Sequence, residues 1–256
     1  MKNYSVGEFL ACIVARELKN DDLVAFGLNA ELVLAAAYLA QKIYSPNLRI
    51  RHGLNFERGT QLSPSAWTED TKAKSSGIVE YNESHDLILN MASPKNTNIL
   101  CNTFFVSGLQ IDKCGNTNLL GLKGSNKKFK LRGPGCIGTT SIAQFARKYF
   151  IFSLEHSTRR FVESVDYVSS IGYGIRKKYG IFGGPLLCFT PLCVFDFSDG
   201  KMRIKSIHRH SSLDEVLEKT GFKPIIPKRI PTTKEPTQDE LRTLREIDKE
   251  SIENFE

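Results

Sequence analysis

An alternation of helical and strand patterns over the first 52 residues constrains the fold of this chain more than any other feature of its sequence. Residues 6–18 repeat apolar side chains at helical spacing behind a capping box formed by Ser5 and Glu8. The expected elements are a helix at 5–18, a strand at 23–26, a helix at 30–44 and a strand at 48–51. This order predicts an α/β sheet whose parallel strands are joined by right-handed helical crossovers.

The middle of the chain is less regular. Residues 53–82 are polar and lack periodicity, which is typical of a long functional loop or an insertion. Further on we expect apolar segments at 87–91 and 104–106, a turn at 112–118 that joins 108–111 to a strand at 119–122, a basic glycine-bearing loop at 123–138, a helix from 139 to about 148 and a strand at 150–152.

The second half favours β structure. Residues 162–169 and 186–197 have strand composition, and Asp199–Gly200 predicts a hairpin turn into a strand at 202–207. Four prolines predict an extended arm at about 223–236, between two short helices with capping boxes at 212–215 and 237–240. We therefore predict a single domain over residues 1–256, with an open, mostly parallel α/β sheet, flanking helices and an antiparallel portion in the second half.

Composition bounds the class of protein. A hydrophobic content of 41% and a charged content of 25% are typical of a soluble globular protein. No apolar run reaches the ~20 residues of a membrane span, and the start lacks a secretory layout, so we expect a cytoplasmic protein. The cysteines show no CxxC spacing and the five histidines no ligand spacing, which favours reduced thiols and no metal site.

The charge balance narrows the partners. The chain has 35 basic and 28 acidic residues, a surplus of seven. Such a surplus attracts nucleic acid, an acidic protein or a phosphorylated ligand. The basic residues do not form one stripe with aromatic residues between them, so we expect no nucleic-acid partner.

Several segments, in order along nearly the whole chain, resemble the β subunits of the glutaconate CoA-transferase family, within the class I CoA-transferases. The most distinctive are Gln-Ile-Asp at 110–112 with Gly-Asn-Thr-Asn at 115–118, and Arg-Phe-Val-Glu-Ser-Val-Asp-Tyr-Val-Ser at 160–169. The other matching segments lie at 4–9, 22–27, 46–48, 194–197 and 241–248. The resemblance implies a CoA-transferase/NagB-like fold and an α-type partner subunit, in a heterodimer or heterotetramer.

The resemblance also implies a substrate. It is an acyl-CoA thioester, with coenzyme A part of the substrate and no permanently bound cofactor. Residues 169–173 are most similar to a branch that opens a steroid ring by hydrolysis, and another branch decarboxylates a glutaconyl-type CoA thioester. The family fold therefore leaves the reaction open.

One position separates these reactions. In the transferases of the family, a glutamate at the end of the second strand attacks the thioester, which is nucleophilic catalysis. The matching residues here are Arg51, His52 and Gly53. An arginine stays protonated and cannot act as a carboxylate nucleophile. Arg51 and His52 either clamp a substrate carboxylate and exchange protons, or pack against the partner subunit; Glu57 is a weaker candidate nucleophile because its spacing is wrong.

A second candidate site is the loop at 131–138. The resemblance implies that its backbone N–H groups hold a thioester oxyanion, with Gly133, Gly135 and Gly138 contacting the substrate. Cys136 replaces a glycine of the family motif. Cys136 is either a reactive thiol at a helix start or a small packing residue.

Two further segments are candidates for substrate contact. Gly27 and Asn29 follow the first strand, and ligands of α/β proteins bind at the carboxyl ends of parallel strands. The basic residues between 123 and 132 either meet the phosphates of coenzyme A or form a solvated loop.

The loss of the glutamate favours decarboxylation or hydrolytic C–C cleavage of an acyl-CoA. Two alternatives remain. Either the chain is a CoA-transferase subunit whose nucleophile is supplied elsewhere, or it is a non-catalytic subunit that shapes the site of its partner.

Overall fold

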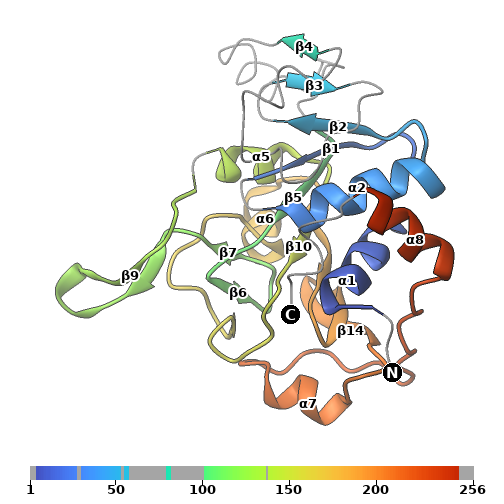
Figure 1. The fold of residues 1–256 in the computed structure, drawn as a ribbon. Helices are drawn as coiled ribbons and strands as arrows, with labels where there is room; N and C mark the ends of the chain where they lie inside the picture. Colours follow the sequence, from blue (N-terminus) through green and yellow to red (C-terminus); the bar gives the residue numbers. More distant parts are fainter. Residues whose placement is uncertain are drawn as a thin grey trace. The chain divides into compact units, whose positions relative to one another are not determined.

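The computed structural model describes residues 4–27, 30–52, 55–57, 79–81, 101–136 and 138–247, with the backbone alone at 51, 52, 55–57, 79–81, 127 and 145. The chain divides into two compact units: unit 1 comprises residues 1–105 and 234–256, and unit 2 comprises residues 106–233 (Figure 1). Each unit is described by itself. The single-domain interpretation of residues 1–256 stays a prediction.

The sheet of unit 1 is built on parallel strands. Strand β1 (Leu23–Phe26) pairs in parallel with β2 (Arg49–His52) on one side and with β5 (Thr103–Val106) on the other. Strands β3 (Asn55–Glu57) and β4 (Val79–Tyr81) continue the sheet beyond β2 in antiparallel pairing. All four residues of β1 are buried, as expected for a central parallel strand.

Three helices complete unit 1: α1 (Val6–Ala15), α2 (Glu31–Ile43) and α8 (Gln238–Ile247). They lie together in Figure 1, where α2 packs against both α1 and α8. Helix α1 begins at the predicted capping box, in which Ser5 Oγ accepts from the Glu8 N–H and the Glu8 carboxylate accepts from the Ser5 N–H. Among the described residues, no helix combines the length and the apolar character that crossing a membrane requires.

Buried ion pairs fasten α8 to the start of the chain. The Glu240 carboxylate, 1% exposed, accepts from Arg16 Nε at 2.7 Å and Nη2 at 2.6 Å, and from the Tyr44 hydroxyl at 2.5 Å. Arg245 donates to the buried carboxylate of Glu8. These contacts bring the two ends of the sequence into one unit.

The larger sheet of unit 2 mixes strand directions. Strand β10 (Lys148–Phe152) pairs in parallel with β12 (Pro185–Phe189), and β12, β13 (Cys193–Ser198) and β14 (Lys201–Ile207) pair antiparallel. The predicted turn at Asp199–Gly200 joins β13 to β14 with positive φ at both residues. The described strands and helices thus confirm an α/β fold with an antiparallel portion in the second half.

The predicted proline-rich arm is extended and lies along the edge of β14. The Ile204 N–H donates to the Ile225 carbonyl at 3.0 Å, and the Thr233 N–H donates to the Ile207 carbonyl at 2.8 Å. The arm therefore covers backbone groups that an open edge strand would expose.

Smaller elements complete unit 2. One sheet contains β11 (Phe161–Val162), β6 (Gln110–Asp112) and β7 (Thr117–Asn118), and β8 (Gly121–Lys123) with β9 (Phe129–Arg132) forms a separate two-stranded sheet. The helices are α5 (Thr139–Phe145), α6 (Tyr173–Tyr179) and α7 (Leu213–Glu218).

Several predicted boundaries are wrong. The turn at 112–118 leads into β7 rather than into a strand at 119–122, and the loop predicted at 123–138 contains β9. The helix predicted at 139–148 ends at Phe145, the strand predicted at 162–169 is confined to Phe161–Val162, and the irregular segment 53–82 contains β3 and β4. The apolar segment predicted at 87–91 lies outside the described residues.

Candidate functional site

The predicted strand-end residues of unit 1 share one edge of its sheet. Ala25 of β1 pairs with Arg51 of β2, and Phe26 pairs with Phe105 of β5. Because these strands are parallel, their carboxyl ends meet at that edge. Gly27 follows β1 directly and is exposed, and a Cβ atom added to it would meet no atom within 4 Å.

The register of β2 and β3 places the other predicted residues. Arg51 pairs with Phe56 and His52 with Asn55, whereas Glu57 pairs with Ile50. Because β3 runs back along β2, the backbone of Glu57 lies farther from the carboxyl edge than that of His52. The side chains of Arg51 and His52, and the whole of Asn29, lie outside the described residues, so their roles stay predictions.

The glycine loop belongs to unit 2, and the N–H groups of its first two glycines are already hydrogen-bonded. The Gly133 N–H donates to the Leu120 carbonyl at 2.9 Å, and the Gly135 N–H donates to the Leu119 carbonyl at 3.1 Å. A Cβ atom at Gly133 would lie 2.2 Å from the Leu119 carbonyl oxygen. An oxyanion contact from these two amides would replace an internal hydrogen bond.

The end of the loop has a different conformation. Gly135 and Gly138 adopt positive φ angles of 95° and 74°, and α5 begins directly after Gly138. Cys136 is partly exposed, whereas Cys12, Cys188 and Cys193 are buried and burial raises the pKa of all three thiols. Its exposure keeps the reactive interpretation of Cys136 as a prediction, beside the packing interpretation.

A buried arginine holds the helix that follows the loop. The side chain of Arg176 is 2% exposed, and its Nη2 donates to the Ala143 carbonyl in α5. Its Nε donates to the Ile171 carbonyl at 3.0 Å, Nη1 donates to the Phe182 carbonyl, and the guanidinium carbon lies 5.5 Å from the centroid of the Tyr149 ring. Burial lowers the pKa of Arg176.

Sequence reasoning missed Arg176. The available signal was a set of three cations, at 176–178, within a stretch, residues 167–195, that contains no Asp or Glu with which to pair. A cation in such a stretch is sometimes buried against carbonyl groups or aromatic rings. The sequence does not say which of the three is buried or which groups surround it.

The motif at 110–118 is a structural hydrogen-bond network. The Asp112 carboxylate accepts from the Cys114 N–H at 2.9 Å and from the Asn116 N–H at 3.0 Å, and the Asn116 Oδ1 accepts from the Gly172 N–H at 2.7 Å. Asn118 Nδ2 donates to Gln110 Oε1 at 2.8 Å. Burial raises the pKa of Asp112, against the hydrogen bonds that lower it. These contacts fix a turn and leave little capacity for a ligand.

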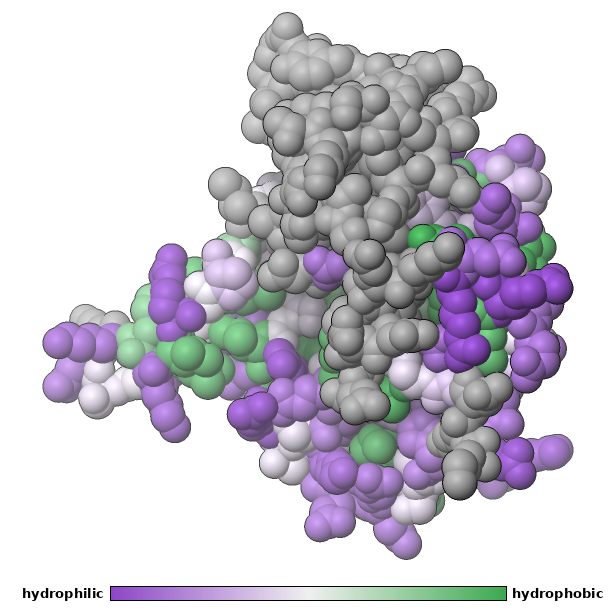
Figure 2. Space-filling view, in the orientation of Figure 1, coloured by the Kyte–Doolittle hydropathy of each residue, from purple (hydrophilic) through white to green (hydrophobic). Residues whose placement is uncertain are grey.

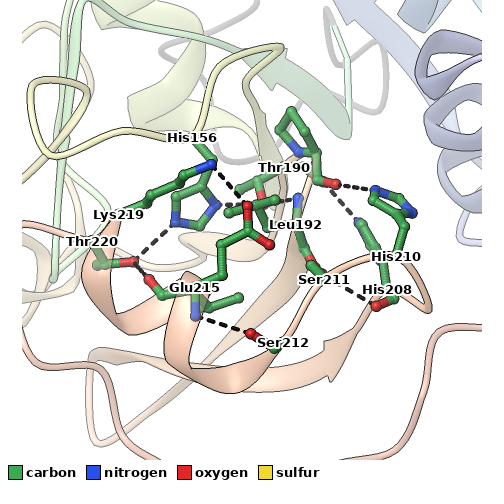
Figure 3. A network of polar contacts seen from close by, with 12 residues as sticks. His156, Thr190, Leu192, His208, His210, Ser211, Ser212, Glu215, Lys219 and Thr220 are labelled. Atoms are coloured by element: carbon green, nitrogen blue, oxygen red, sulfur yellow. Dashed lines mark hydrogen bonds and ion pairs between the residues drawn. The ribbon is translucent and has the colours of Figure 1, made fainter.

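A second buried network surrounds His156 (Figure 3). Its Nδ1 lies 2.8 Å from Thr190 Oγ1 and its Nε2 lies 2.9 Å from Thr220 Oγ1. The Thr220 hydroxyl donates to the Val216 carbonyl at 2.6 Å, so it accepts from Nε2–H, and in the neutral ring Nδ1 accepts from Thr190. Both ring nitrogens are thus occupied, and His156 anchors α7 rather than serving as a base.

The predicted Ser, Asp and Glu residues around 163–166 form no catalytic triad in the described structure. Glu163 pairs with Lys113, and Asp166 accepts from the Lys123 N–H at 2.9 Å. Within the described ranges, no three His, Cys, Asp or Glu side chains lie close enough to hold a metal ion.

Comparison with known proteins gives a consistent result. No protein-family model matches the chain. The β-type subunit of the 3-oxoadipate CoA-transferase of Pseudomonas knackmussii is 29% identical over 97% of this chain and 95% of its own. The β-type subunit of the glutaconate CoA-transferase of Acidaminococcus fermentans is 29% identical over 86% of this chain and 84% of its own. The IpdB subunit of the cholesterol ring-cleaving hydrolase of Rhodococcus jostii is 31% identical over 54% and 56%.

Solved structures agree in fold. The glutaconate CoA-transferase of Acidaminococcus fermentans superposes with a TM-score of 0.81 and 26% identity over 96% of this chain and 95% of the matched chain. The decarboxylase AibA/AibB superposes with a TM-score of 0.77 at 21% identity, which shows the fold alone. Likeness in sequence and in fold over nearly the whole chain identifies it as a β-subunit-type member of the class I CoA-transferase family.

Proposed function

We propose that this chain is the β-type subunit of a heteromeric enzyme that pairs with an α-type homologue and acts on an acyl-CoA thioester. Its reaction is decarboxylation or hydrolytic C–C cleavage of a carboxylated acyl-CoA, and not transfer of coenzyme A. The observation that carries the proposal is Arg51, which stands at the end of β2 beside Ala25 of β1, where the resemblance implies an attacking glutamate. Coenzyme A enters as part of the substrate, in the cytoplasm, with no permanently bound cofactor.

The chemistry of the guanidinium supports a reaction without a covalent enzyme intermediate. A transferase of this kind needs a carboxylate that attacks the thioester and then carries the acyl group and coenzyme A in turn. A guanidinium is permanently cationic, so it binds a carboxylate in bidentate fashion. Arg51 would orient the carboxylate of the substrate, and His52, whose imidazole titrates near neutral pH in water, would exchange a proton with the reacting carbon or with water.

The comparisons also favour a second candidate function. Two relatives that match most of the chain are named as CoA-transferases. In that case the nucleophile comes from another position or from the partner subunit. A third candidate, a subunit that only shapes the site of its partner, predicts unchanged turnover for both Arg51→Ala and His52→Ala.

One experiment separates these functions. The chain, copurified with its α-type partner, is incubated with a carboxylated acyl-CoA and a free carboxylic acid, and the products are separated by mass. We expect loss of carbon dioxide or uptake of water, with no exchange of coenzyme A between the acids. Robust exchange, together with a glutamate that hydroxylamine or borohydride labels, would overturn the proposal in favour of the transferase.

A further inference from the structure

The two-stranded hairpin in unit 2, residues 121–132, is exposed and projects from the rest of its unit. Strand β8 pairs antiparallel with β9, with Gly121 opposite Arg132, and a single 3₁₀ turn at Ser125–Lys127 joins them. All four residues of β9 are exposed. Figure 1 shows this hairpin extending away from β6 and β7. An isolated two-stranded ribbon is marginally stable in water, so such a hairpin is usually covered.

The hairpin carries apolar side chains that this chain leaves in contact with water. Phe129 is 37% exposed and Leu131 is 50% exposed, and the alternation of a strand places both on the same face. In Figure 2 the apolar residues gather on the projecting hairpin between hydrophilic ones. Tyr167 contacts the Phe129 ring at a centroid distance of 5.5 Å, which covers only part of that ring. Exposed apolar groups framed by polar residues indicate an interaction surface.

The charge of the hairpin is of one sign. Residues 121–132 contain five Lys or Arg and no Asp or Glu, and unit 2 as a whole has 21 Lys or Arg against nine Asp or Glu. In the described part of the chain, none of Lys123, Lys128, Lys130 and Arg132 forms an ion pair, although Arg132 stacks over the Phe129 ring at 5.1 Å. This surface therefore complements an acidic one.

The shape of the hairpin decides between a small anion and a protein as its occupant. Small-molecule sites are concave and enclose most of their ligand. A projecting ribbon is convex, and two apolar side chains on one face with cations around them fit a groove on another protein. The phosphates of coenzyme A would pair with the cations but would leave Phe129 and Leu131 exposed.

We propose that the hairpin at 121–132 is a docking arm that inserts into an acidic-rimmed apolar groove on the α-type partner subunit. Phe129 and Leu131 fill the groove, and Lys128, Lys130 and Arg132 pair with carboxylates at its rim. This inference rests on the proposed function only in that it requires an α-type partner.

The test measures the association of separately purified subunits by sedimentation velocity at about 50 mM and about 500 mM salt. We expect Phe129→Ser with Leu131→Ser to weaken association by about 100-fold at either salt concentration, because two buried apolar anchors are lost. We expect Lys128→Glu with Lys130→Glu to weaken it by about 100-fold at low salt and by less at high salt, because salt screens the repulsion.

Matched controls come from the proline-rich arm. Ile226 is 42% exposed, and Lys223 and Lys228 are exposed as well. Ile226→Ser, and Lys223→Glu with Lys228→Glu, should leave the affinity within about threefold of wild type. Circular dichroism of each variant establishes that the chain is folded before its affinity is compared.

The outcomes are distinguishable. If the wild-type subunits do not associate at all, the proposed heteromer fails. If they associate and the hairpin variants bind like wild type, the docking arm is excluded. Loss of self-association of this chain, or loss of coenzyme A binding, with α-type association intact would overturn the proposal in favour of a second copy or of the nucleotide.

Discussion

His156 is a buried side chain whose ionisation makes the stability of the folded chain depend on pH. Burial, and then the charge of Lys219, lowers the pKa of His156 from its ordinary value of 6.5 to about 4. Between these values the unfolded chain binds more protons than the folded chain, so the free energy of unfolding falls as the pH falls. The full loss is about 3 kcal/mol.

Urea unfolding from about pH 7 to about pH 4.5 measures this effect. The variant His156→Gln should be less stable at neutral pH, because it gives up the contacts with Thr190 and Thr220, and its stability should change less with pH. His210→Gln, at an exposed position, is the control and should follow wild type. A pH dependence of His156→Gln equal to that of wild type would show that another group is responsible.

Gly133 and Gly135 differ in why the chain needs glycine, although both belong to the same motif. At Gly133 a Cβ atom would lie 2.2 Å from the Leu119 carbonyl oxygen, so Gly133→Ala forces a backbone shift and should cost about 3 kcal/mol. At Gly135 there is open space but φ is 95°, so Gly135→Ala should cost about 1–2 kcal/mol.

Chemical denaturation of the two variants tests this order. A smaller loss for Gly133→Ala than for Gly135→Ala would contradict the hydrogen-bonded arrangement of the loop against Leu119 and Leu120. The comparison also bears on function, because a glycine required by packing is weaker support for an oxyanion site than one required by a ligand.

At the scale of elements, α8 depends on one buried carboxylate. Burial opposes ionisation of Glu240, but hydrogen bonds from Arg16, Tyr44 and the Thr237 amide outweigh it and lower the pKa of Glu240 to about 2. Glu240→Ala leaves Arg16 and Tyr44 without this acceptor, so we expect a loss of about 3–5 kcal/mol in urea unfolding. The contribution should be present above pH 4.5 and lost as the pH falls towards 2.

A neighbouring exposed pair is the control for Glu240. The side chains of Arg242 and Asp239 are 72% and 61% exposed, so Asp239→Ala should change stability by only about 0.5 kcal/mol. A similar effect of the two substitutions would mean that Glu240 is hydrated in solution and that its ion pair does not fasten α8.

The elements that the sequence predicted well are those with local signals. The capping box at Ser5, the apolar run at 23–26 and the Asp199–Gly200 turn each specify their structure within a few residues. Helix α6 was missed because no side chain caps its start, and its end at Gly180 lies only seven residues on. Strand β9 was missed because its pattern reads as a basic loop until β8 pairs with it.

The candidate site was predictable only in part for the same reason. The carboxyl ends of parallel strands follow from the order of elements, so Gly27 and the end of β2 could be placed at one edge. The bonds that occupy the amides of Gly133 and Gly135 come from Leu119 and Leu120, and no spacing in the sequence reveals them. Arg176 likewise acts through carbonyls 5 to 33 residues away.

At the scale of the whole molecule, the charge is divided unevenly along the chain. Unit 2 has 21 basic and nine acidic residues, which leaves 14 basic and 19 acidic residues in unit 1. The surplus of seven positive charges therefore arises from unit 2 alone. A chain with this division presents an electropositive surface to an anionic partner even though its net charge is modest.

The residue at the end of β2 tests how the complete enzyme treats its substrate. If Arg51 occupies the position of an attacking carboxylate, Arg51→Glu in the complex with the α-type subunit should form a covalent glutamyl thioester with coenzyme A, because a positioned carboxylate is sufficient for attack. Mass spectrometry after borohydride reduction detects this adduct on one peptide. Arg51→Gln and Arg49→Glu, two residues earlier in β2, should form none. An adduct on Arg49→Glu, or none on any variant while acyl-CoA still binds, would place the reacting carbon away from the end of β2.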